Sequence, residues 1–241
     1  KAHGVETRPV LIGPVSFLLL GKTQEDGLHP LDLLDDLLPV YAEVLQALAD
    51  AGADAVQLDE PTLVLDLSDE ERAAFTQAYE ALADAADLDL HVATYFGDLE
   101  DNLPTALDLP VDALHLDLDR GEGQLQAALD HGVPDDLALS LGVIDGRNVW
   151  RADLDDLLET VEAATRALGT DRVFVGPSCS LLHVPVDLDT EPVLSDEMKR
   201  WFAFAAQKVE EIVALAERVD GNEEATEALF EKSRAARKAR A

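Results

Sequence analysis

The stretch VFVGPSCSLLH holds the only cysteine of the chain, Cys179, and a histidine four residues later, His183. A thiol near an imidazole could act as a nucleophile with its base, or both side chains could bind a metal ion. No basic residue precedes Cys179 to lower the pKa of its thiol, and a lone buried cysteine is commonly an unreactive part of the core. The residues alone therefore favour a core cysteine over a nucleophile.

The stretch VQLDEP contains three polar residues that could bind a ligand or transfer a proton. Gln57 and Asp59 alternate with apolar residues, so they are expected on one face of a strand, with Glu60 at the strand end. A carboxylate in that position suits the binding of an ammonium group or general acid–base work. The alternative is a buried ion-pair partner that stabilises the fold.

The stretch GVIDGRNVWR is expected to join a strand end to a helix. It brings together Asp145, Arg147 and Asn148, and an arginine in such a loop could bind a carboxylate or a phosphate. The alternative is a loop held by pairing of the aspartate with the arginine, with Asn148 in a turn.

Zinc takes three or four cysteine, histidine or carboxylate ligands, and ligands on separate strands could converge at one end of a barrel. The chain has no His-x-His, His-x-Cys or Cys-x-x-Cys pair, so spacing alone does not favour a zinc site. The candidates would be His91, His115, Asp117, Cys179 and His183.

Short strand-like runs alternate with amphipathic helical patterns along the chain, which is typical of a parallel sheet covered by helices. Neither a GxGxxG motif nor a phosphate-binding P-loop motif is present, so nucleotide binding is unsupported. The expected strands lie within residues 9–14, 54–61, 88–97, 112–120, 137–146 and 172–180. The expected helices lie within residues 31–51, 69–85, 99–107, 122–131, 153–168, 195–219 and 222–238.

The polar residues of the strands favour a barrel over an open doubly wound sheet. In ALHLDLDR, leucines alternate with His115, Asp117 and Asp119. A strand buried on both faces is usually apolar throughout, whereas a barrel strand can point polar groups inward. We therefore predict an α/β fold of the TIM-type (β/α)8 barrel, partial because about six βα units are present. Residues 1–219 would form the barrel without its first units, and residues 220–241 a C-terminal helical tail.

The charge of the chain excludes two classes of partner. The 50 acidic residues outnumber the 18 basic ones, giving a net charge of −32. A field of that sign repels nucleic acids and anionic membranes.

No apolar run approaches the roughly 20 residues that a membrane helix needs. The single cysteine excludes an internal disulfide framework and fits a reducing compartment, which predicts a cytoplasmic protein.

Seven stretches, in this order, together resemble cobalamin-independent methionine synthase over nearly the whole chain. They are PVLIGPVSFLLLGK, LLPVYAEVLQALADAGADAVQLDEPTLVLDL, TYFGDLEDNL, LHLDLDRG, GVIDGRNVWRADL, SCSLLHVPVDL and KRWFAFAAQKVEE. The family consists of two βα barrels that look like products of a duplication. The chain resembles the N-terminal barrel without its first part.

The resemblance implies a non-catalytic role for this segment. In the family, the C-terminal barrel holds zinc, homocysteine and the catalytic histidine, and the N-terminal barrel helps to bind the polyglutamate tail of the folate. No catalytic residue, metal or cofactor is therefore expected here. Zinc and the methyltetrahydrofolate substrate belong to the parent enzyme, and the expected partner is its C-terminal zinc-bearing barrel, with no nucleic acid and no membrane.

The duplication implies which positions correspond to the catalytic barrel's ligands. By that match, the zinc-ligand positions are Ala93, Tyr95, Asp117 and Cys179, and the first two cannot ligate zinc as an imidazole or thiolate does. Cys179 would be a relic of a metal position and His183 a structural residue. Asp59 matches the aspartate that holds the homocysteine amine, and Arg147 stands in the place of the catalytic histidine. The expected substrate-binding candidates are Gln57, Asp59, Glu60, Asp117, Arg147 and Asn148.

The leading hypothesis is the N-terminal, non-catalytic barrel of an enzyme that transfers a methyl group from 5-methyltetrahydrofolate polyglutamate to homocysteine. One alternative is a stand-alone scaffold or binding subunit beside a separate zinc barrel. Another is a distinct barrel enzyme that uses Asp59, Glu60, His115 and Asp117 for acid–base chemistry.

The acidic composition predicts that salt stabilises the protein. Acidic residues spread along the helices repel one another, and molar salt screens that repulsion. The thermal unfolding midpoint should therefore rise as sodium chloride is increased from about 0.1 M to about 2 M. Circular dichroism measures the midpoint. A midpoint that stays constant or falls as salt is added would contradict the hypothesis that the acidic surface is adapted to high salt.

Overall fold

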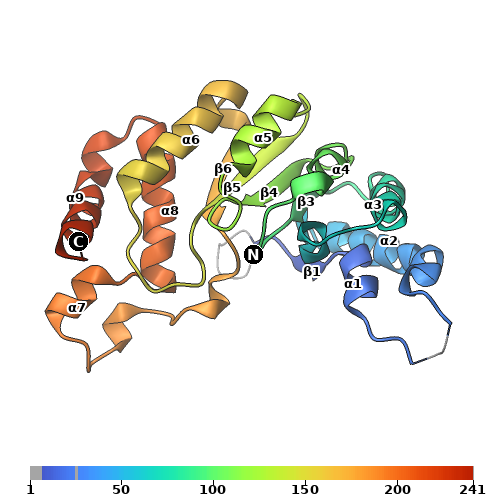
Figure 1. Cartoon of the computed structure of the whole chain (residues 1–241), viewed down its shortest axis with the longest axis horizontal. Coiled ribbons are helices and arrows are strands. Elements are labelled where there is room, and N and C mark those ends of the chain that lie inside the picture. Colours follow the sequence, from blue (N-terminus) through green and yellow to red (C-terminus); the bar gives the residue numbers. More distant parts are fainter. Residues whose placement is uncertain (1–6, 25–26, 241) are drawn as a thin grey trace. The chain divides into compact units, whose positions relative to one another are not determined.

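The computed structural model describes residues 7–24 and 27–240, in which six strands alternate with helices (Figure 1). The strands are parallel, and their order in the sheet follows the sequence, β1-β2-β3-β4-β5-β6. Sequential parallel pairing is the strand order of a (β/α)8 barrel, so the α/β fold with six βα units is confirmed. The strands are β1 (Val10–Ile12), β2 (Ala55–Asp59), β3 (Asp89–Ala93), β4 (Ala113–Asp117), β5 (Ala138–Ile144) and β6 (Val173–Pro177).

The helices agree with the predicted ranges except at two places, discussed below. Within the described residues, each helix is too short or too polar to span a bilayer. The helices are α1 (Pro14–Leu20), α2 (Leu34–Asp50), α3 (Asp69–Leu82), α4 (Leu103–Leu107), α5 (Gln124–His131), α6 (Leu154–Leu168), α7 (Asp196–Trp201), α8 (Ala205–Val219) and α9 (Glu223–Arg240).

One difference is a break inside the helix predicted over residues 195–219. Ser195 caps α7 as its side chain accepts a hydrogen bond from the Met198 amide, but Phe202 is extended, with φ of −100° and ψ of 153°. Residues on either side of the break bond to the segment before α6: the Arg151 amide donates to the Trp201 carbonyl at 2.9 Å. Tertiary hydrogen bonds therefore override the helical pattern and divide it into α7 and α8.

The other difference is α1, which lies outside the predicted helix ranges. Its sequence PVSFLLL is an apolar run in which polar residues do not recur at helical spacing. Pro14 occupies the first turn, where its missing N–H costs no hydrogen bond. The amides of Val15 and Ser16 point at the end of β2, so the helix depends on a contact that is distant in sequence.

The chain divides into two compact units, of which unit 1 comprises Lys1–Leu116 and Gly123–Ala138. In unit 1 the pairs Leu58↔Val92 and Val92↔Leu114 align apolar residues across β2, β3 and β4. All three side chains are fully buried, and so are Phe75 and Tyr79 of α3. This alternation places Gln57 and Asp59 on the opposite side of β2 from the helix-facing core.

Unit 2 comprises Asp117–Glu122 and Leu139–Ala241. Its strands β5 and β6 pair in parallel, and α8 packs against β6 and α6. Helix α9 lies along α6, α7 and α8 (Figure 1). The predicted boundary between a barrel ending at residue 219 and a separate tail stays a prediction.

Helix α9 is anchored by buried side chains rather than by charge alone. Phe230 is buried beneath the Arg218 guanidinium, which lies 4.1 Å from the ring centre. The Ser233 hydroxyl donates to the Ala152 carbonyl at 2.6 Å and accepts from the Leu154 amide at 3.1 Å. These contacts fix α9 to the start of α6.

Replacing Phe230 with alanine should destabilise unit 2, because the change removes a fully buried ring and leaves a cavity. We expect the free energy of unfolding to fall by about 3–4 kcal/mol. Urea denaturation followed by the fluorescence of Trp150 and Trp201, both in unit 2, measures it. Leu182→Ala, at a residue that is 93% exposed, is the control and should change the value by less than about 0.5 kcal/mol. Equal effects of the two variants would refute the anchoring role.

Candidate functional site

The candidate site residues of unit 1 lie at the C-terminal end of β2. The Gln57 side-chain amide donates a hydrogen bond of 2.8 Å to Oδ1 of Asp59, and the Tyr95 hydroxyl donates to Oδ2. Both oxygens of the carboxylate therefore accept hydrogen bonds from neutral groups of the chain itself.

Ala93 and Tyr95, the two positions matched to soft zinc ligands, have other roles here. Ala93 is buried opposite Asp59 in the β2–β3 register, and its carbonyl accepts from the Glu60 amide at 2.8 Å. The Tyr95 ring packs edge-on against Phe96 with centroids 4.8 Å apart. The methyl group of Ala93 therefore packs in the core, and the phenol of Tyr95 forms a hydrogen bond with Asp59.

Glu60 is fully buried and joins β2 to the start of α1. Its carboxylate accepts from the Ser16 amide at 2.7 Å, from the Val15 amide at 3.4 Å and from the Tyr79 hydroxyl at 3.0 Å. A Cβ atom on Gly13 would come within 2.1 Å of the Glu60 side chain, so only glycine fits there. Since these partners are neutral donors, Glu60 anchors α1 instead of forming the ion pair considered above.

Burial also sets the protonation of this cluster. Desolvation raises the pKa of Glu60 to about 7, although the bonds from Ser16, Tyr79 and Val15 favour the ionised form. Burial, followed by the field of Glu60, raises the pKa of Tyr79 well above its usual value and that of Tyr41 to about 12. Both phenols therefore remain hydrogen-bond donors at neutral pH.

Within the described part of unit 1, His91 and His115 belong to no group of three or more side chains that could hold a metal ion. The Arg8 guanidinium donates to Nδ1 of His91, and burial, followed by the Arg8 charge, lowers the pKa of His91. His115 is half-buried on β4, and its carbonyl accepts from the Thr94 amide at 3.2 Å and hydroxyl at 2.7 Å.

In unit 2, Asp117 is buried at the end of β4 and organises the following turn. Its Oδ1 accepts from the amides of Asp119 at 3.1 Å and Arg120 at 3.0 Å. Burial, followed by the charges of Asp145 and Asp117, raises the pKa of Asp119. Asp117 thus stabilises a turn, and its field favours protonation of its neighbour.

The loop after β5 is held by its own side chains. Asp145 accepts from the Arg147 amide at 2.7 Å and from the Asn148 side chain. Asn148 in turn accepts from the Trp150 amide at 2.9 Å and from Nζ of Lys208 at 3.3 Å. Arg147 projects from this turn with an exposed side chain.

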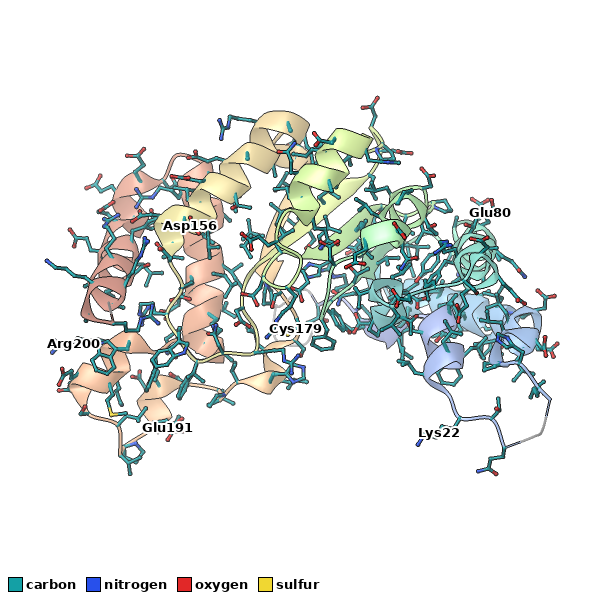
Figure 2. The ribbon with its side chains drawn as sticks, in the orientation of Figure 1. Lys22, Glu80, Asp156, Cys179, Glu191 and Arg200 are labelled. Carbon is teal, nitrogen blue, oxygen red and sulfur yellow. The ribbon has the colours of Figure 1, made fainter. Side chains whose placement is uncertain are left out.

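Cys179, labelled in Figure 2, lies against Gly146 of the same loop. It is 4% exposed, and a Cβ atom on Gly146 would come within 2.6 Å of its carbonyl oxygen and 3.0 Å of its sulfur. The Gly146 amide donates to the Ser178 hydroxyl oxygen at 3.1 Å. Burial raises the pKa of Cys179, which keeps it a thiol, while His183 is exposed at the end of the short turn Leu181–His183.

Sequence reasoning missed a buried charged group on α8. Lys208 and Glu211 are 1% and 0% exposed, and Glu211 lies 3.3 Å from the guanidinium of Arg151. Burial lowers the pKa of Lys208 and raises that of Glu211 to about 7, against the opposing fields of their partners. The signal was available: Lys208 and Glu211 fall at helical spacing between Phe204 and Leu215, which are buried.

The described residues do not fit the zinc site of the resemblance. No group of three or more histidine, cysteine, aspartate or glutamate side chains converges among residues 7–24 and 27–240 in a way that could hold a metal ion. Tyr95 donates to Asp59, and Asp117 accepts from the turn that follows it. The polar side chains at the strand ends instead form hydrogen bonds with other groups of the same unit.

The chain matches one family model, described as the N-terminal domain of cobalamin-independent synthase, over residues 1–169. It is 84% identical over 241 residues to the 5-methyltetrahydropteroyltriglutamate–homocysteine methyltransferase of Salinibacter ruber. It is 54% identical over 242 residues to the enzyme of the same name from Caulobacter vibrioides. Each comparison covers 100% of this chain but 31% of the relative, so the chain spans about a third of their length.

Solved structures agree with the fold. A B12-independent methionine synthase from Shewanella sp. W3-18-1, in complex with selenomethionine, matches with a TM-score of 0.67 and 16% identity over 90% of this chain and 62% of that one. The putative vitamin-B12 independent methionine synthase of Listeria monocytogenes gives a TM-score of 0.63 at 16% identity, over 89% and 64%. At this identity the likeness concerns the fold alone.

The raised pKa of Glu60 predicts a specific pH dependence of stability. The folded chain holds a proton on Glu60 up to about pH 7, whereas the unfolded chain loses it near pH 4.5. Stability from this group is therefore complete below pH 4.5 and is lost as the pH rises to about 7. Glu60→Gln imitates the neutral acid, so the wild type should lose roughly 2–3 kcal/mol relative to the variant between pH 4.5 and pH 8.

Urea denaturation at constant ionic strength, repeated across that pH range, measures the difference. Glu211, whose pKa is also raised, contributes equally to both proteins and cancels. Glu43→Gln makes the same charge change at an exposed site of α2 and should follow the wild-type profile. A difference between wild type and Glu60→Gln that does not vary with pH would disprove the assignment.

Proposed function

Because the chain belongs to the cobalamin-independent synthase family, as its N-terminal domain, we propose that it is the non-catalytic N-terminal part of a methionine synthase. The relatives that it matches along its whole length are homocysteine methyltransferases. In the proposed parent reaction, a methyl group moves from 5-methyltetrahydrofolate polyglutamate to the sulfur of homocysteine.

The observation that carries the proposal is the internal satisfaction of Asp59. Tyr95 and Gln57 donate to its two oxygens, so the group that would hold a substrate amine already has partners within the chain. A catalytic site keeps such groups for the substrate and the transition state. We therefore assign a structural role to the end of β2. We assign the methyl transfer to a separate C-terminal part of the parent enzyme.

In that parent, zinc on the C-terminal barrel would lower the pKa of the homocysteine thiol and present its sulfur. The residues of this chain have other tasks. Glu60 stabilises the end of β2 in unit 1, and Asp117 stabilises the turn after β4 in unit 2. The single cysteine, buried as a thiol, agrees with a cytoplasmic setting.

Among the six substrate-binding candidates, Arg147 is the residue best placed to meet a ligand. Its side chain is exposed, while Glu60 and Asp117 are buried and Gln57, Asp59 and Asn148 are half-buried. A guanidinium on a loop held from below can bind a carboxylate through charge-assisted hydrogen bonds. We propose that Arg147 contacts an anionic group of the folate.

One observation favours the alternative of a distinct acid–base enzyme. The pKa of Glu60 is raised to about 7, as a general acid or base would require. The same residue is 0% exposed and accepts from two amides of α1 and from Tyr79. A carboxylate enclosed in this way is out of reach of a substrate, so the raised pKa follows from a structural role.

Methyl transfer assays test the proposal. The purified chain should show no transfer from methylfolate to homocysteine above background and no stoichiometric zinc by elemental analysis. Adding a separately expressed zinc-bearing barrel should restore turnover. Turnover or bound zinc with this chain alone would refute the non-catalytic role.

The restored mixture also tests Arg147. Arg147→Gln should raise the KM for the polyglutamylated folate about fivefold, as the loss of one charge-assisted hydrogen bond would do. Arg166→Gln, at an exposed arginine of α6, carries the same charge change and should leave KM unaltered. Equal KM values for both variants would remove Arg147 from substrate binding without affecting the non-catalytic assignment.

A further inference from the structure

Unit 2 contains a cavity of about 560 Å³ between α7 and α9, away from the strand ends of this unit that carry candidate site residues. Arg200, labelled in Figure 2, is one of its lining residues, and α7 and α9 lie side by side in Figure 1. The volume falls in the range of small-molecule sites, which is roughly 300–1,000 Å³. The cavity is therefore large enough for a ligand of moderate size.

The charge of the lining is the reverse of the charge of the chain. Four basic residues line the cavity, with a single acidic residue, Glu197, whereas the whole chain has 18 basic and 50 acidic residues. The basic residues are Arg151, Lys199, Arg200 and Lys232. In a protein of net charge −32 this concentration of cations creates a local field that attracts anions.

One of these cations is fixed and three are available. Arg151 is held by Glu211 at 3.3 Å and by the Phe202 carbonyl at 3.1 Å, so Glu211 offsets its charge and Arg151 forms a fixed part of the wall. Lys199, Arg200 and Lys232 make no ion pair with any residue of the described chain. Their ammonium and guanidinium groups can bind an incoming anion without breaking an internal pair.

The remaining lining is apolar. Trp201 ends α7, and three alanines of α9 face the cavity where longer side chains would fill it. An indole ring provides a surface on which a flat apolar group can stack. The cavity thus combines an apolar wall with a lining that has more basic than acidic side chains.

We propose that this cavity binds a small organic anion that carries two or three carboxylate or phosphate charges on a flat apolar body. The cations would bind the charged groups, and Trp201 would stack on the body. The cavity shares no residue with the substrate-binding candidates, so this inference is independent of the proposed function.

Isothermal titration calorimetry tests the proposal by measuring the affinity of the 241-residue chain for three probe compounds. Benzene-1,3,5-tricarboxylate carries three carboxylates on a ring, phenyl phosphate carries a phosphate on a ring, and citrate carries three carboxylates without a ring. We expect one of the two ring compounds to bind at least tenfold more tightly than citrate. The tighter of the two identifies whether carboxylate or phosphate is the preferred anion.

Variants locate the binding. Lys232→Gln combined with Arg200→Gln should weaken the tighter ring compound about tenfold or more. Lys238→Gln, at an exposed lysine of the same helix outside the cavity, should change affinity less than twofold. The fluorescence of Trp201, observed in a Trp150→Phe background with excitation at the red edge of indole absorption, should change on binding. The double variant in the same background should need about tenfold more ligand for the same change.

Several results would overturn the proposal. They are absence of binding by both ring compounds at millimolar concentration, citrate binding as tightly as they do, or Lys238→Gln weakening binding as much as the double variant. Circular dichroism and urea denaturation of each variant exclude unfolding as the cause, since the substituted side chains are exposed or half-buried.

Discussion

A shortage of cations governs how this chain satisfies its buried carboxylates. The sequence supplies 18 basic residues for 50 acidic ones, so most acids cannot have an ion-pair partner. Burial of an unpaired carboxylate is costly unless hydrogen-bond donors surround it. Glu60 is satisfied by amides of α1 and the Tyr79 hydroxyl, Asp59 by Gln57 and Tyr95, and Asp117 by the amides of its own turn.

The cations are also unevenly distributed between the two units. Fourteen of the eighteen fall in unit 2 and four in unit 1, counted over the unit boundaries. In unit 1, neutral donors hold Glu60 and Asp59, and Glu60 is left with a raised pKa. Unit 2 can pair Arg151 with Glu211 and Arg234 with Asp155, and has basic residues remaining around the α7–α9 cavity. The same constraint thus produces different chemistry in each unit.

The sequence predicted what depends on local pattern. The six strands and most helices follow from alternation and helical spacing, and Glu60 and Asp59 were recognised as strand-end carboxylates. The break between α7 and α8 was missed because the hydrogen bonds that cause it come from residues 149–151, far away in the chain. The bond from Tyr95 to Asp59 depends on how far a phenol reaches between neighbouring strands, which the spacing of residues does not encode.

The hydrogen bonds to Asp59 stabilise the end of β2 without a ligand. A carboxylate that awaits a ligand is a cost to the empty protein, because its desolvation is compensated only on binding. A tyrosine that donates to that carboxylate removes the cost at once, and the strand end becomes more stable as it becomes less able to bind. The buried thiol of Cys179, enclosed by the Gly146 loop, is compatible with the same course, since a raised pKa suits packing and not metal binding. Asp117 is likewise satisfied without a ligand, because the amides of its own turn donate to its carboxylate.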